Sequence, residues 1–143
     1  MNKKMNIVIV GLGNIGSYFY SYLKKNKKVL FNKTNTVPNI FYVSAKSLNK
    51  KRNLKIPKKL WLKNCLLAPK IKEVDIIIEL IGGAEGIAKK LVFDALSNKK
   101  HVITANKALI AKYGDQLARI AEKNNVNLEF EAAVCGGIPI IRS

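Results

Sequence analysis

One stretch of the sequence decides the fold: Met5-Asn6-Ile7-Val8-Ile9-Val10-Gly11-Leu12-Gly13-Asn14-Ile15-Gly16. Its first half is apolar and β-branched, and it runs directly into glycines spaced G-x-G-x-x-G. An amphipathic helix follows, because apolar side chains recur at positions 15, 19, 22 and 23 before the lysines at 24–28. Strand, glycine turn and helix in this order predict a binding site for the diphosphate of a dinucleotide.

Each glycine of the turn has its own expected role. Gly11 permits the tight turn, Gly13 lets the backbone approach a pyrophosphate, and Gly16 lets helix and strand pack closely. The helix is expected to begin near Asn14, so the free N–H groups of Asn14 and Ile15, together with the helix dipole, would face the anion.

The remaining apolar patterns predict strands that alternate with helices. We expect strands at 40–44, 74–81, 101–104 and 126–134, and helices at 88–96, 107–112 and 115–123, with a break at Tyr113-Gly114. The basic segment 46–63 is expected to be a loop with at most a short helical turn. Alternating strands and helices imply a parallel sheet with right-handed crossovers. The predicted fold class is therefore α/β, a Rossmann-like, doubly wound parallel sheet.

Composition and charge exclude several classes of protein. The 143 residues are 48% apolar, enough for one globular domain, and no apolar run is long enough to span a membrane. The net charge is +17, but residues 1–72 carry 17 basic side chains and no acidic one, whereas residues 73–143 carry nine of each. Such asymmetry is typical of polyanion binding, although 23 Lys against 3 Arg also suits a drift toward AT-rich codons.

The absence of a carboxylate before Glu73 predicts which dinucleotide is bound. NAD-selective sites place an acidic residue about 20 residues past the glycines, at the end of the second strand, to bind the ribose 2′-OH. Here that strand leads into Ser44-Ala45-Lys46, with Lys50-Lys51-Arg52 beyond. Lysines attract a 2′-phosphate, so we expect NADP as the cofactor, with NAD as the alternative and Lys46 as the phosphate contact. The alternative is that these lysines belong to a solvated loop with no role in cofactor binding.

The last eight residues, Gly136-Gly137-Ile138-Pro139-Ile140-Ile141-Arg142-Ser143, resemble a turn followed by the opening of a helix. Because the apolar pattern stops inside this element, we expect a truncated reading frame or a fragment, with a short disordered tail as the alternative. The expected division is a dinucleotide-binding domain at 1–134 and the start of a further, missing domain at 135–143.

Three further segments, together with the glycine turn, resemble homoserine dehydrogenase in amino-acid sequence and in their order along the chain. They are Glu79-Leu80-Ile81-Gly82-Gly83, His101-Val102-Ile103-Thr104-Ala105-Asn106-Lys107-Ala108-Leu109 and Phe130-Glu131-Ala132-Ala133-Val134-Cys135-Gly136-Gly137-Ile138-Pro139. The resemblance implies NAD(P)-dependent interconversion of L-homoserine and L-aspartate 4-semialdehyde, in threonine, methionine and isoleucine biosynthesis. It also implies a cytoplasmic homodimer whose dimerisation needs the missing domain.

The resemblance also assigns roles to individual residues. It places Ile81 and Gly82 at the cofactor and makes Lys107 the catalytic residue beside the nicotinamide and substrate. It further implies a sodium ion held mostly by backbone carbonyls of Glu131, Val134, Gly136 and Ile138. The family's other catalytic groups lie after the glycine-proline segment, so we expect this polypeptide alone to bind nucleotide without measurable catalysis.

Two other functions compete with this interpretation. An aldehyde-class NADP enzyme with Cys135 as nucleophile would need a nearby histidine base, but His101 opens a different strand. A non-enzymatic nucleotide- or nucleic-acid-binding module would use the basic first half. Against nucleic acid, the aromatics Tyr18, Phe19, Tyr20 and Tyr22 fall in one helix rather than on a stacking sheet.

Overall fold

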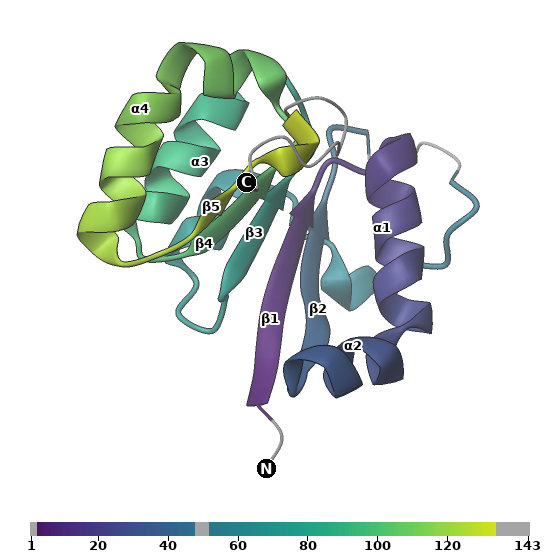
Figure 1. Cartoon of the computed structure of the whole chain (residues 1–143). Coiled ribbons are helices and arrows are strands. Elements are labelled where there is room, and N and C mark those ends of the chain that lie inside the picture. The colour runs from purple at the N-terminus through teal and green to yellow at the C-terminus, as the bar shows by residue number, and fades with distance from the viewer. Residues whose placement is uncertain (1–2, 48–51, 134–143) are drawn as a thin grey trace.

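The computed structural model describes residues 3–47 and 52–133, which form a five-stranded parallel sheet in the order β2-β1-β3-β4-β5. The strands are β1 (Lys3–Val10), β2 (Thr36–Ser44), β3 (Ile76–Glu79), β4 (His101–Thr104) and β5 (Leu128–Glu129). Their carboxyl ends all point to one edge of the sheet (Figure 1). The predicted parallel α/β fold is confirmed.

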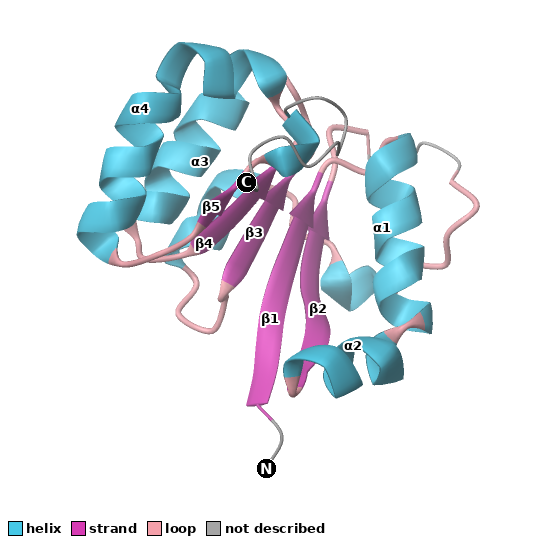
Figure 2. Ribbon diagram, in the orientation of Figure 1, coloured by secondary structure: helices cyan, strands magenta, loops and turns pink. Residues whose placement is uncertain are grey.

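Helices cover both faces of this sheet (Figure 2). The chain forms α1 (Asn14–Lys25) and α2 (Lys27–Thr34) on one face, and α3 (Ile87–Ser97) and α4 (Lys107–Asn124) on the other. Short 3₁₀ turns lie at Lys58–Leu60, Cys65–Lys70 and Glu131–Ala133. The chain moves from β1 to β2 on one side and then returns past β1 to β3, so the order of the strands reverses between β1 and β3. Ligands of open α/β sheets bind at this switch point.

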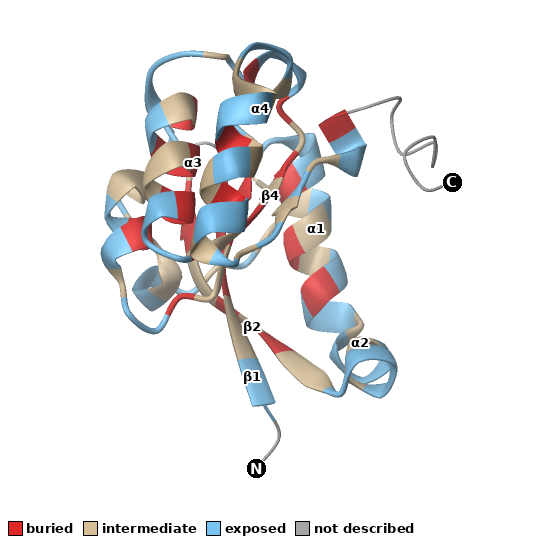
Figure 3. Ribbon diagram, turned by 60° about the vertical axis from the view of Figure 1, so that its left-hand side comes forward, coloured by how far each residue is buried: buried red, intermediate tan, exposed pale blue. Residues whose placement is uncertain are grey.

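The core has two layers because alternate residues of β1 face opposite ways. Ile7 and Ile9 pack with Tyr20 and Leu23 of α1, whereas Val8 and Val10 belong to the core under α3 and α4. Figure 3 marks buried residues in α1, α3 and α4, whereas α2 has none. Burial on both faces explains the continuous apolar runs at 7–10 of β1 and at 76–78 of β3.

Two predictions were wrong and one helix was not predicted, and each difference has a physical cause. Helix α4 runs without a break through Tyr113-Gly114, because Leu109 and Leu117 are fully buried and packing outweighs the roughly 1 kcal/mol cost of an interior glycine. The predicted strand 126–134 pairs only at Leu128–Glu129, since its partner β4 ends at Thr104. Helix α2 was not predicted, because it buries no residue and so lacks an apolar stripe.

Other predictions hold with modified limits. Strand β2 starts four residues earlier than expected and includes Pro38, which an edge strand tolerates. The basic segment after β2 contains the expected short turn at Lys58–Leu60. Within residues 3–47 and 52–133, no helix combines the length and apolar content needed to traverse a lipid bilayer.

Candidate functional site

The glycine turn after β1 lies at the switch point and is held by its neighbours. Gly11 has φ +102°, a backbone conformation that favours glycine, and its N–H donates to the carbonyl of Ser44 over 2.9 Å. A Cβ on Gly11 would lie 2.6 Å from the Leu80 carbonyl oxygen. The turn therefore passes between the end of β2 and the loop after β3, with no space for a side chain.

The other two glycines differ in their surroundings as the motif predicts. A Cβ on Gly16 would lie 1.9 Å from the Gly11 carbonyl oxygen, so the helix approaches the turn too closely for alanine. A Cβ on Gly13 would meet no described atom within 4 Å. Gly13 thus leaves its backbone open to an approaching ligand, while Gly11 and Gly16 shape the turn.

The first turn of α1 offers unpaired donors to an anion. Gly13 is the N-cap and makes no side-chain capping bond, and Asn14–Lys25, all of it described, has no acidic residue in its first turn. The first N–H groups of a helix have no intrahelical acceptor, and the helix dipole adds partial positive charge there. Ile15 points its side chain into solvent. Asn14 and Ile15 can therefore contribute backbone N–H groups to a diphosphate.

A cavity of about 440 Å³ opens beside this turn at the carboxyl ends of the strands. Its lining comes from the ends of β1 and β2, the segment 63–66, the loop after β3 and the start of α3, and includes Val10, Ser44, Lys46, Lys63, Ile81 and Gly82. The structure thus brings together three predicted residues, Lys46, Ile81 and Gly82. Sequence reasoning missed Lys63, which looked like one lysine among 23. The volume is in the range of small-molecule sites.

Arg52 braces the glycine turn. Its Nε donates to the Leu12 carbonyl over 3.1 Å and its Nη2 to the Ser47 carbonyl over 2.8 Å, while its guanidinium lies over the Trp61 ring. Two of the cation's donors therefore bind carbonyls of the turn and of the segment leaving β2. Lys50 and Lys51, predicted alongside it, lie outside the described residues.

Lys107 is exposed at the first position of α4, immediately after the N-cap Asn106. The Asn106 side chain accepts from the Leu109 N–H over 3.1 Å and donates to the Gly83 carbonyl over 2.7 Å. The segment that carries Lys107 is therefore tied to the loop after β3. This confirms the expected position beyond a strand end, and leaves the catalytic role as a proposal.

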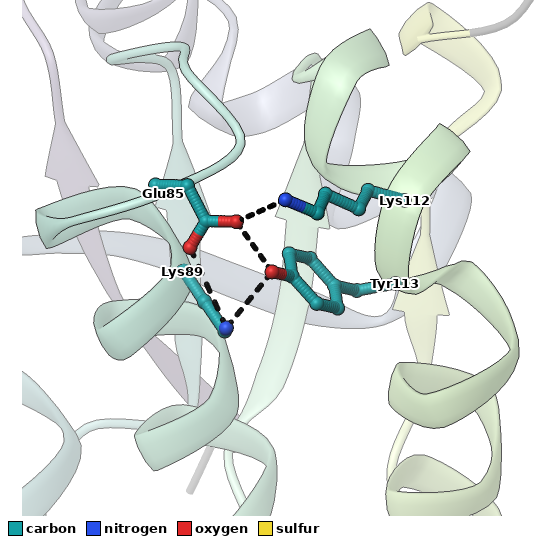
Figure 4. A network of polar contacts seen from close by, with 4 residues as sticks. All are labelled: Glu85, Lys89, Lys112 and Tyr113. Carbon is teal, nitrogen blue, oxygen red and sulfur yellow. Dashed lines mark hydrogen bonds and ion pairs between the residues drawn. The ribbon is translucent and has the colours of Figure 1, made fainter.

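A cluster of four polar side chains ties the same loop to α4 on the outside of the molecule (Figure 4). Glu85 accepts from Lys112 Nζ over 2.6 Å and from the Tyr113 hydroxyl, and Lys89 Nζ donates to that hydroxyl over 2.9 Å. The hydrogen bonds from Lys112 and then Tyr113 lower the pKa of Glu85 from 4.5 to about 2. The cluster fixes one wall of the cavity, which Glu85 also lines.

The chain has one histidine and two cysteines, of which His101 and Cys65 lie within the described residues. His101 Nδ1 accepts from the Asn127 N–H over 3.0 Å, which links β4 to the segment before β5. The Cys65 thiol is half-buried, and burial raises its pKa, which disfavours a reactive thiolate. Cys135 lies outside the described residues.

Most of the predicted sodium site also lies outside the described residues. Glu131 is exposed in the 3₁₀ turn Glu131–Ala133, whereas Val134, Gly136 and Ile138 are not described. The same holds for the predicted domain start at 135–143. Within the described ranges, no group of three or more His, Cys, Asp or Glu side chains could hold a metal ion. A carbonyl site would not appear among such groups.

A parallel sheet with a glycine turn at its switch point, an uncapped helix start and an adjacent cavity defines a dinucleotide-binding domain of the Rossmann-like class. The sequence model of "Homoserine dehydrogenase, NAD binding domain" matches residues 11–131. The chain therefore belongs to the homoserine dehydrogenase NAD-binding-domain family, which confirms the resemblance noted in the sequence.

Individual relatives agree with this assignment. The chain is 39% identical to homoserine dehydrogenase of Neisseria gonorrhoeae over 141 residues, covering 99% of this chain and 32% of the relative. The Bacillus subtilis enzyme is 38% identical with the same coverage. The chain thus spans about a third of the length of these curated relatives.

Solved structures show the same fold. The homoserine dehydrogenase of S. aureus at pH 7.5 superposes with a TM-score of 0.84 at 36% identity, covering 92% of this chain and 34% of that one. The homoserine dehydrogenase of Thiobacillus denitrificans gives 0.85 at 35% identity, covering 97% and 32%. A hyperthermophilic archaeal homoserine dehydrogenase solved with NADPH gives 0.75 at 23% identity, covering 96% and 47%, a likeness of fold.

Proposed function

We propose that this chain binds a nicotinamide dinucleotide across the carboxyl ends of β1 and β3, with NADP preferred over NAD. The observation that carries the proposal is the glycine turn at the switch point, where Gly13 is open and the start of α1 is uncapped. Backbone N–H groups with no partner in the helix are the donors that a diphosphate needs. The cavity beside Val10 is large enough to hold one nucleoside part of the dinucleotide next to the diphosphate.

The charge around this cavity supports the preference for NADP. Two lysines line it: Lys46, just past the end of β2 where an NAD-selective site would carry an acidic residue, and Lys63, between the 3₁₀ turns at Lys58–Leu60 and Cys65–Lys70. A charge-assisted hydrogen bond contributes about 1.5–3 kcal/mol, so one bond to a 2′-phosphate favours NADP by about tenfold to a hundredfold, and a second bond increases the preference further. The one carboxylate in the lining, Glu85, is bound to Lys112 and Tyr113.

We further propose that the domain serves an enzyme that interconverts L-homoserine and L-aspartate 4-semialdehyde, as the relatives' names imply. The bound nicotinamide would supply or accept the hydride. Lys107 is the proposed catalytic residue, because its exposed ammonium at the start of α4 can donate to a substrate oxygen and stabilise a developing alkoxide. Its position beyond the end of β4 is where ligands of such sheets bind.

Titration of the purified chain with NADPH and NADH tests the cofactor proposal. We expect saturable binding of both, with a dissociation constant for NADPH at least tenfold lower. Comparable constants would refute the NADP preference, and no binding of either at millimolar concentration would refute the site. The activity proposal is tested by NADPH oxidation with aspartate semialdehyde in a whole protein containing this domain, where Lys107→Ala must lower kcat.

A further inference from the structure

The conformation of the loop after β3 is not held by side-chain packing at its two glycines. Gly82 and Gly83 have φ values of +77° and +86°, and a Cβ on either would meet no described atom within 4 Å. Side-chain packing therefore does not hold these two residues in place. Yet Ile81 and Gly82 line the cavity, so the shape of the proposed cofactor site depends on them.

Three buried polar residues, Glu79, Thr104 and Asn106, are bonded to this loop or to one another. Glu79 is the only carboxylate among the buried polar residues of the described ranges, which also include Ser44 and Lys100. Burial of a carboxylate is costly unless donors surround it. Glu79 Oε1 accepts from the N–H groups of Ile81 over 2.8 Å and Gly82 over 3.0 Å, and its Oε2 accepts from the Thr104 hydroxyl over 2.6 Å.

These bonds close into a ring that crosses two strands. Thr104 Oγ1 accepts from the Asn106 N–H over 3.0 Å, and Asn106 Nδ2 donates to the Gly83 carbonyl over 2.7 Å. Gly83 follows Gly82, whose N–H donates back to Glu79. We call this closed path through Glu79, Thr104, Asn106, Gly83 and Gly82 the Glu79 ring. The register makes it available, because Glu79 and Thr104 are neighbours in adjacent parallel strands.

The ring joins the two functional segments of the site. One side of it is the cavity loop, and the other ends at Asn106, the N-cap of α4 and the residue before Lys107. The N–H groups of Ile81 and Gly82 also donate to Glu79, so they are not available to a cofactor. These two residues can therefore contact a cofactor only through apolar atoms.

We propose that Glu79 is a positioning residue, whose buried carboxylate sets the cavity loop and the Lys107 turn in one fixed relation through Thr104 and Asn106. The expected effect on NADPH affinity rests on the proposed function, whereas the effect on the rigidity of the loop can be measured without a ligand. Removal of the Thr104 hydroxyl should make the loop at 81–83 more mobile, although this hydroxyl does not contact the loop itself.

Thr104→Val tests the ring with a change of one hydroxyl. It leaves the loop and Lys107 chemically intact and keeps a side chain of similar shape. We expect the amide hydrogens of Ile81 and Gly82 to exchange at least about tenfold faster relative to those of β1, since a bond to a charged group is worth about 1.5–3 kcal/mol. The NADPH dissociation constant should rise about tenfold, and Thr104→Ser should restore both values to within about twofold.

Val92→Ala is the matched control for a general loss of stability. Val92 is fully buried in α3 and takes no part in the ring, so this variant should lower the unfolding midpoint without changing relative exchange or NADPH affinity. The proposal is overturned if Thr104→Val speeds exchange only in proportion to its loss of global stability, or if serine is no better than valine. Failure of the wild-type chain to bind NADPH would remove the proposed function, and the exchange data would still decide the role of Glu79.

Glu79→Gln provides a second test if the valine variant does not fold. Its amide oxygen can still accept from the loop N–H groups, but its NH₂ group cannot accept from the Thr104 hydroxyl. We expect faster exchange at Ile81 and Gly82 relative to β1, as in the valine variant, because their N–H groups lose a charged acceptor and the Thr104 hydroxyl loses its own acceptor. Unchanged relative exchange at these two amides would contradict the proposal.

Discussion

Replacement of Gly16 by alanine should destabilise the fold, although alanine ordinarily stabilises a helix. The added Cβ would lie 1.9 Å from the Gly11 carbonyl oxygen, whereas real Cβ atoms stay beyond 3.0 Å. Neither atom can rotate away, because one is bonded to the helix backbone and the other belongs to the turn. The start of α1 must therefore move by more than 1 Å relative to Gly11.

The magnitude follows from two opposing effects. Forced overpacking costs about 1–3 kcal/mol, and this rigid contact belongs at the upper end. Helix propensity returns at most about 1 kcal/mol for alanine over glycine. The net loss is about 2 kcal/mol, or roughly 6–8 °C in Tm for a chain of this length. Because the displaced atoms shape the diphosphate site, NADPH affinity should fall at least about tenfold.

Two other glycines separate these effects in the same assays, which are thermal unfolding and NADPH titration. Gly13→Ala adds a methyl group into open space, so its Tm should change little while NADPH binding is lost. Gly114→Ala lies inside α4, with its Cβ 3.6 Å from Ile110 Cγ2, and should gain about 1 kcal/mol with unchanged binding. A Gly16→Ala variant as stable as wild type with unaltered binding would refute this account of the turn.

Three further predictions concern charged residues. The Glu85 carboxyl should titrate near pH 2 by NMR, and its pKa should shift toward 4.5 in Lys112→Met. Because folding lowers this pKa, the contribution of Glu85 to stability is present above about pH 4.5 and is lost as the pH falls toward 2. Arg52→Lys keeps the charge but loses the planar fork that bridges two carbonyls, so NADPH affinity measured by titration should fall about tenfold, and an unchanged constant would contradict the bracing role. Lys46→Ala should weaken NADPH about tenfold and leave NADH unchanged, whereas the remote Lys33→Ala removes the same charge from α2 and should alter neither; equal losses in both variants would indicate a general charge effect.

The sequence was informative where one physical requirement dominates a segment. Strand segments buried on both faces are mostly apolar, so β1 and β3 were predicted from their runs of isoleucine and valine at 7–10 and 76–78. The glycine spacing likewise follows from close approaches that the structure shows at Gly11 and Gly16. These segments could be predicted because their local pattern and their tertiary role agree.

The sequence was silent where a role depends on a distant partner. Nothing in the residues around Glu79 shows that its carboxylate meets Thr104, 25 positions later, or that Arg52 reaches back to Leu12. Lys63 joins the cavity only through the 3₁₀ turns that follow β2. The continuity of α4 also depends on packing that a local pattern with Gly114 does not reveal.

The central claim is that bare main-chain amides at the start of α1 bind the diphosphate of a nicotinamide dinucleotide. Backbone amide NMR of the purified chain during NADPH titration tests it most directly. The account predicts large, saturable shifts at Gly13, Asn14 and Ile15, with smaller ones at the lysines of α2. Unchanged signals at these three positions at millimolar NADPH would contradict it.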